Sequence, residues 1–198
     1  MTTSSSILAA LDELPESVRR AAILAGGALR AVYDGSKVKD YDLFFRTKED
    51  YEAAISALAA LVKHDADFEP EPGSWRIGEH LGSYGTANFI SPTGRLFNLI
   101  GFVFGEPLEH LALFDFLCCR MAVFQSNGRP VFHAEHGAVE DASARRLTVL
   151  SNNGTERTIK RIEHYMEDYG YKLVDPEDSP AEYVRRIPLS PRGGNGYG

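Results

Sequence analysis

The sequence has few of the features that mark secreted or membrane-spanning proteins. Its 198 residues include only two cysteines, Cys118 and Cys119, and because they are adjacent we expect both to be reduced. Residues 1–7 are polar and contain no apolar signal segment, and the longest apolar runs, such as residues 53–62, are too short to span a bilayer. We therefore expect a cytoplasmic protein with no membrane partner.

Positive charge is also scarce. The chain has 21 Lys and Arg against 28 Asp and Glu, a net charge of −7. Residues 141–198 carry nine of each sign, so the first 140 residues carry the whole acidic excess. Binding to long duplex nucleic acid depends on neutralising phosphates with Lys and Arg, and this composition argues against it. A small anionic ligand carried with a metal ion is compatible with the acidic charge.

The remaining composition, 43% hydrophobic and 25% charged, is that of a globular protein. Residues 21–25 form an apolar run that ends at Gly26-Gly27, which predicts a buried strand entering a tight turn. Together the patterns predict an α+β (α/β-like) fold, a mixed sheet flanked by helices. We expect strands at 21–25, 38–46 and in a hairpin over 86–104, and helices at 6–11, 16–22, 28–33, 47–62 and 107–124.

The C-terminal third predicts a smaller helical part. Residues 141–150 and 155–169 have helical patterns, and Gly170 is placed to cap the second helix. From residue 176 the chain is rich in Pro and Gly, and we expect it to be extended, with disorder from about residue 190. The chain therefore divides into a domain at 1–140, a helical segment at 141–175 and a tail at 176–198.

Two short motifs suggest chemistry. Asp40 and Asp42 are spaced to share one face of a strand, where their oxygens are suited to one or two Mg²⁺ or Mn²⁺ ions. Gly26-Gly27, between a strand and a helix, suits a phosphate at the helix N-terminus. Taken singly, the glycines are more often a plain turn and the carboxylates a solvated strand edge. Their combination, thirteen residues apart, favours a site for a metal-bound nucleoside triphosphate.

These residues carry a family resemblance. The motif resembles the head of class II CCA-adding enzymes and bacterial poly(A) polymerases, in the DNA polymerase beta-type nucleotidyltransferase superfamily, and the positions in register are Gly26, Gly27, Arg30, Gly35, Asp40, Asp42 and Leu43. Residues 114–122 are similar to the family's middle motif, and residues 161–173 to the helix of its neck. The overall layout also resembles small phage-encoded nucleotidyltransferase-like proteins, which implies the host cytoplasm as its location if the chain is phage-encoded.

The resemblance implies a transferase that moves a nucleoside monophosphate from ATP or another nucleoside triphosphate to a hydroxyl of an RNA end, a protein or a small molecule. Asp40 and Asp42 would be catalytic and would bind the metal, and Gly26 and Gly27 would bind the nucleotide. Arg30 would clamp either the phosphates or a neighbouring carboxylate.

Several departures leave the activity open. The base-reading signature of the neck would fall on Gly154, Thr155 and Thr158 and is missing, and no long RNA-binding body follows residue 175. Where many superfamily members have a third carboxylate, this chain offers only Asn98. A catalytically weakened binding or interaction module is therefore the alternative hypothesis.

Two further residues are candidate accessory groups. Asp115 lies in an apolar segment and is costly to bury without a partner, so it either orients Arg30 or another site group, or serves as a third acidic residue. Arg161 belongs to a basic set that would meet either a triphosphate or a polynucleotide end, or would form a solvated helix face. The other members of that set are Arg145, Arg146, Arg157 and Lys160.

Overall fold

A seven-stranded mixed sheet lies at the centre of the computed structural model, which describes residues 4–62, 74–78, 85–175 and 179–189. The strand order is β3-β4-β5-β2-β1-β6-β7, and only the β2–β5 pair is parallel. The strands are β1 (Ile23–Ala25), β2 (Tyr41–Phe45), β3 (Arg76–Ile77), β4 (Thr86–Ile90), β5 (Leu96–Phe104), β6 (Met121–Ser126) and β7 (Arg129–Ala134). The α+β class expected from the sequence is confirmed.

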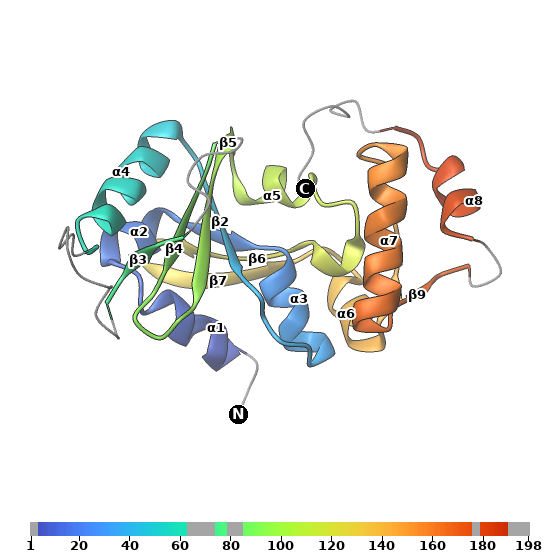
Figure 1. Ribbon diagram of the computed structural model, residues 1–198, viewed down its shortest axis with the longest axis horizontal. Helices are drawn as coiled ribbons and strands as arrows, with labels where there is room; N and C mark the ends of the chain where they lie inside the picture. Colours follow the sequence, from blue (N-terminus) through green and yellow to red (C-terminus); the bar gives the residue numbers. More distant parts are fainter. Residues whose placement is uncertain (1–3, 63–73, 79–84, 176–178, 190–198) are drawn as a thin grey trace.

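Helices flank this sheet (Figure 1), with α1 and α3 along one side of it and α4 and α5 along the other. The described helices are α1 (Ser4–Leu11), α2 (Glu16–Ala21), α3 (Gly27–Asp34), α4 (Lys48–Ala59), α5 (Pro107–Leu111), the 3₁₀ turn η1 (Leu117–Cys119), α6 (Ala138–Ala144), α7 (Thr155–Tyr169) and α8 (Pro180–Arg185). In the part of the chain that the structure describes, no helix is long and apolar enough to cross a membrane.

Local signals in the sequence account for several of these elements. The Thr47 hydroxyl accepts a hydrogen bond of 3.1 Å from the Asp50 N–H, which caps the start of α4. The loop between β4 and β5 closes with Gly94 at a φ of +84°, a left-handed value that favours glycine. Gly170 ends α7 in the left-handed conformation, as its position predicted.

Other expectations were wrong. Residues 107–124 do not form one helix: α5 ends at Leu111, η1 follows, and β6 begins at Met121. The segment is mostly apolar, and burial on both sides of a strand produces the same composition as a buried helix, so periodicity does not distinguish them. Likewise α6 ends at Ala144, and residues 146–147 form β8 instead of continuing a helix.

The predictions for the C-terminal tail and for one loop have different outcomes. Within the tail expected to be extended, Pro180–Arg185 form α8, because Ser179 and Glu182 make a reciprocal capping box. The loop expected at 65–72 and the disorder expected at 190–198 fall outside the described residues.

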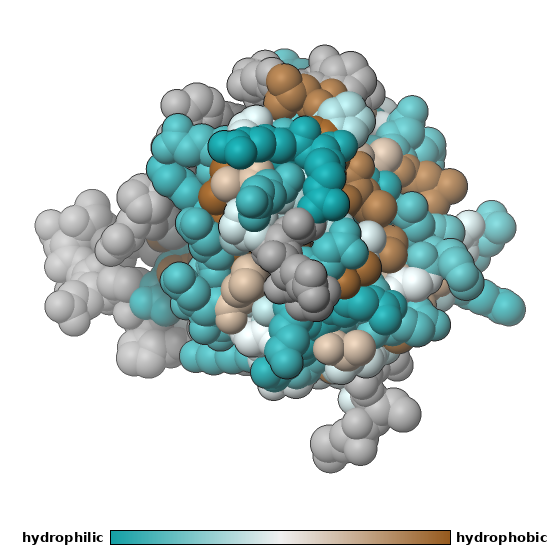
Figure 2. Space-filling model, turned by 90° about the vertical axis from the view of Figure 1, so that its right-hand side faces the viewer, coloured by the Kyte–Doolittle hydropathy of each residue, from teal (hydrophilic) through white to brown (hydrophobic). Residues whose placement is uncertain are grey.

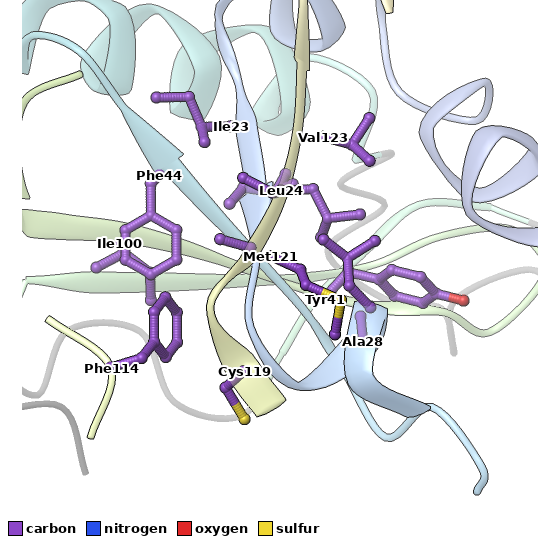
Figure 3. Close-up of a cluster of buried hydrophobic side chains, with 14 of the residues drawn as sticks. Ile23, Leu24, Ala28, Tyr41, Phe44, Ile100, Phe114, Cys119, Met121 and Val123 are labelled. Atoms are coloured by element: carbon purple, nitrogen blue, oxygen red, sulfur yellow. The ribbon is translucent and has the colours of Figure 1, made fainter. Parts of the chain in front are cut away.

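One core joins the sheet to the helices. Figure 3 shows part of this core, in which Phe44, Ile100 and Phe114 pack together. The ring centroids of Phe44 and Phe114 are 6.0 Å apart. The C-terminal helices α6 to α8 gather at one end of the molecule (Figure 1), where β8 pairs in parallel with β9 (Lys172–Leu173). The surface of that end is mostly hydrophilic (Figure 2). Buried side chains of this end, among them Leu147 and Ile162, belong to the same core as those of the sheet.

Candidate active site

The candidate site lies at one end of three neighbouring strands. Asp42 of β2 is in register with Ala25 of β1 on one side and with Asn98 of β5 on the other. Gly26 and Gly27 follow Ala25 directly, so the glycine turn and the carboxylates lie next to each other. The sheet thus brings together residues that the sequence separates by up to 72 positions, from Gly26 to Asn98.

The side chain of Asn98 joins the two carboxylates. Its Nδ2 donates hydrogen bonds of 3.0 Å to Asp40 Oδ2 and of 3.0 Å to Asp42 Oδ1. Because one nitrogen reaches both, Asp40 and Asp42 point to the same side of the sheet, as their spacing predicted. Asp40 itself lies just before β2, so the strand expected from residue 38 begins only at Tyr41.

Burial makes the charge of Asp42 costly. Desolvation is the main cause that raises the pKa of Asp42 from 3.8 to about 7, and the nearby charge of Asp40 adds to the rise, while the hydrogen bond from Asn98 and the charge of Arg161 oppose it. A site that holds a poorly solvated anion next to a second carboxylate gains stability when a cation binds. This electrostatic strain is typical of functional sites.

The two glycines have different surroundings. Gly26 has a φ of +87°, and a Cβ at this position would lie 2.6 Å from Phe114 Cε1, so packing alone requires glycine here. Gly27 faces open space: apart from its chain neighbours and the backbone of its own helix, no atom of the described residues lies within 4 Å of the place of a Cβ. Gly27 is the first residue of α3, whose first N–H groups have no partner within the helix. The open space at this helix end is suited to a phosphate.

Arg30 lies in the contact between α3 and α7. Its guanidinium is 4% exposed, forms an ion pair with Asp34, and stacks on Tyr169 with 4.1 Å between the guanidinium carbon and the ring centroid. The Tyr171 hydroxyl donates a 2.9 Å hydrogen bond to Asp34 Oδ2. Of the two roles that the sequence allows for Arg30, this geometry supports the clamp on a neighbouring carboxylate.

Asp115 pairs with Arg161 and not with Arg30. It is 1% exposed, and its Oδ1 lies 3.2 Å from Arg161 Nη2. Burial raises the pKa of Asp115, and the charge of Arg161 opposes that shift. Because Arg161 also lowers the pKa of Asp42, it connects α7 electrostatically with the two-carboxylate site. Its side chain is 26% exposed, so it is partly open to solvent.

Sequence reasoning missed two residues, Lys39 and Tyr169, near the candidate site. Lys39 Nζ lies 5.0 Å from the ring centroid of Tyr169 and 4.0 Å from Asp168 Oδ2. A hydrogen bond with Tyr169 is the main cause that raises the pKa of Lys39, and the charges of Asp168 and Asp40 add to it. The position of Lys39, directly before Asp40, was the available signal. The contact with Tyr169 depends on how α7 packs, which sequence spacing does not reveal.

The donor set fits a hard divalent cation. In the described residues no group of three or more His, Cys, Asp or Glu is placed to hold a metal. Asp40 and Asp42 nevertheless provide carboxylate oxygens side by side, and Asn98 provides an amide. Mg²⁺ is held in many proteins by one or two carboxylates, with the remaining positions left for water and substrate phosphates.

Solved structures with the same fold include CCA-adding enzymes and a tRNA nucleotidyltransferase. The chain is similar to the Thermotoga maritima CCA-adding enzyme complexed with tRNA, at 15% identity and a TM-score of 0.56 over 90% of this chain and 41% of that one. It is also similar to a CCA-adding enzyme in complex with CTP, at 12% identity and a TM-score of 0.59 over 92% and 41% of the two chains.

A third structure, a tRNA nucleotidyltransferase with a primer tRNA and an incoming ATP analogue, is 16% identical with a TM-score of 0.58, over 83% of this chain and 46% of that one. The chain spans less than half the length of each of these structures. At this identity the similarity shows a nucleotidyltransferase-like fold.

Among curated proteins there is no significant match. The family model of the Gabija anti-defense 2 family protein (Gad2) matches residues 3–145. The chain belongs to this family. The matched residues include the sheet and the site, from α1 to the end of α6.

Proposed function

We propose that the protein is a divalent-metal-dependent nucleotidyltransferase that moves a nucleoside monophosphate from a nucleoside triphosphate to a hydroxyl acceptor. The observation that carries the proposal is the convergence of Asp40 and Asp42 on one amide nitrogen, at 3.0 Å each, next to the open N-terminus of α3. A solvated strand edge would keep its carboxylates in water, whereas Asp42 is only partly exposed, and desolvation together with the charge of Asp40 raises its pKa to about 7.

In this reaction the acceptor oxygen forms a bond to the α-phosphorus, and the bond from that phosphorus to the oxygen bridging to the β-phosphate breaks. Pyrophosphate leaves with the electron pair, and the acceptor proton passes to solvent. A bound Mg²⁺ or Mn²⁺ would neutralise charge on the phosphates. The ionised carboxylates of Asp40 and Asp42 would hold the cation, and the N–H groups at the start of α3 would receive the phosphates.

The family description gives the reaction a setting. Membership of the Gabija anti-defense 2 family supports a phage-related role in countering the Gabija defence. The acceptor would then be an RNA end, a protein or a small molecule of the host or of the defence system. The acidic chain does not favour long duplex nucleic acid as the acceptor.

The proposal is tested by label transfer. The full chain is incubated with Mg²⁺, host lysate and each α-³²P-labelled nucleoside triphosphate in turn, and the label is followed into RNA, protein and small molecules. We expect label in one of these classes, and none with the Asp40→Asn, Asp42→Asn variant, which keeps the side-chain volumes but removes both charges.

The alternative is a binding module that keeps the fold and has lost the reaction. The amide at Asn98, where a third carboxylate would stand, favours it. Calorimetry with Mg-ATP, Mg-CTP, Mg-GTP and Mg-UTP separates the two. If no nucleotide binds in a metal-dependent way at about millimolar concentration, which corresponds to only about 4 kcal/mol, the binding module is the better explanation.

A further inference from the structure

The position of Asn98 is unusual for an accessory residue, because it lies between the two carboxylates. It is in register with Asp42 across the parallel β2–β5 pair, and its single Nδ2 donates to both Asp40 and Asp42. The Asn98 NH₂ group donates to the same carboxylate oxygens that a bound cation would contact. We therefore expect a cation to bind where this NH₂ group now lies.

We propose that Asn98 is the third protein ligand of a single divalent cation, and that the site does not accept the second cation of a two-metal centre. This inference rests on the proposed function. An amide has a carbonyl oxygen at one end and an NH₂ group at the other. A half-turn about its last torsion replaces Nδ2 by Oδ1, which gives the cation a neutral oxygen ligand beside two carboxylates.

The charges at the site favour one cation over two. Two-metal centres hold their ions about 3.5–4 Å apart, so strong repulsion between them must be offset by anionic ligands. Here Asn98 adds no charge, and its own cross-strand neighbour on β4, Asn88, is also an amide. In the described part of the chain no third acidic, His or Cys side chain joins Asp40 and Asp42 in a metal-binding group.

Arg161 of α7 adds a fixed positive charge that acts on Asp42. The Arg161 guanidinium is held by Asp115, with 3.2 Å between Arg161 Nη2 and Asp115 Oδ1, and its charge attracts the Asp42 carboxylate. A second cation beside Asp42 would be repelled by this guanidinium. The site therefore has the ligands for one cation and a built-in charge that disfavours another.

The test is electron paramagnetic resonance of Mn²⁺ bound to the full chain with a saturating non-hydrolysable nucleoside triphosphate. Two Mn²⁺ ions within about 4 Å give a spin-coupled spectrum that a single ion does not. We expect an uncoupled spectrum for the wild type and a coupled one for Asn98→Asp, which supplies the missing carboxylate. Asn88→Asp is the matched control, because it adds the same charge one strand further from Asp42, and it should remain uncoupled.

A second variant tests Asn98 as a ligand, with Mn²⁺ titrated into the protein without nucleotide. We expect Asn98→Ala to weaken Mn²⁺ binding about tenfold. If Asn98 only donates to the carboxylates, removing it frees their oxygens and binding becomes equal or tighter, which overturns the ligand assignment. Thermal unfolding in Mn²⁺ confirms that each variant is folded.

The outcomes separate this inference from the proposed function. A coupled spectrum in the wild type overturns the single-cation site but leaves nucleotidyl transfer standing. If the wild type fails to bind nucleotide, the proposed function falls, and the Mn²⁺ titration of Asn98→Ala still decides whether Asn98 is a ligand.

Discussion

Asp42→Asn should stabilise the metal-free protein, and more so as the pH rises. An acid whose pKa is raised by folding binds its proton more tightly in the folded state, so the free energy of unfolding falls as the pH rises from the unfolded to the folded pKa. For Asp42 these values are 3.8 and about 7. The variant has no carboxylate at this position and lacks that slope.

The magnitude follows from the shift. Each pKa unit corresponds to about 1.4 kcal/mol, so ionised Asp42 costs up to about 4 kcal/mol above the folded pKa. At about pH 5 the cost is less than half of this, so the difference in unfolding free energy between variant and wild type should grow by about 2–3 kcal/mol from about pH 5 to about pH 8. An asparagine oxygen still accepts the bond from Asn98, so that contact is kept.

Urea unfolding of both proteins in a metal chelator, at the two pH values, measures this difference. Groups other than Asp42 titrate in both proteins and largely cancel. A difference that is constant with pH would refute the reasoning, since it would mean that folding does not raise the pKa of Asp42. Adding Mg²⁺ at about pH 8 should narrow the difference, because only the wild type regains stability by binding it.

Two further predictions concern the contact between α3 and α7. Arg30→Met should cost about 3–5 kcal/mol of unfolding free energy, because it leaves Asp34 buried without its cation. The control Arg20→Met breaks the exposed pair with Glu16 at the same spacing and should cost under about 0.5 kcal/mol. Tyr171→Phe should cost about 1–2 kcal/mol by removing the bond to Asp34. Denaturant unfolding measures all three, and equal losses for Arg30→Met and Arg20→Met would contradict the buried pair.

Signals that act within a few residues were the ones that could be predicted from the sequence. Thr47 caps α4 and Gly170 ends α7 because each satisfies backbone groups of its own helix. The side that Asp40 and Asp42 share follows from the two-residue period of a strand. These features need no knowledge of the rest of the chain.

Features that depend on tertiary packing were missed. The turn from α5 to β6 lies in an apolar segment whose composition suits a buried helix or a buried strand, and only pairing of Met121–Ser126 with β1 and β7 selects the strand. Arg30 was correctly singled out, but its partners Asp34 and Tyr171 are 4 and 141 residues away, and the second contact exists only because α7 folds back on α3.

The paired glycines show why one motif has both a structural and a functional part, and their separate replacement by alanine tests this. In Gly26→Ala the new methyl group would overlap the Phe114 ring, with 2.6 Å to Cε1, at a φ of +87° that alanine rarely adopts. Strain and overlap together should cost about 2–4 kcal/mol of unfolding free energy.

In Gly27→Ala the methyl group enters open space at the first position of α3, where stability should be unchanged or slightly higher. That space is where the phosphates would lie, so Gly27→Ala should weaken Mg-nucleotide binding in calorimetry without changing the denaturation midpoint. Undiminished binding by Gly27→Ala would remove Gly27 from the nucleotide site, and full stability of Gly26→Ala would contradict the close packing of Phe114.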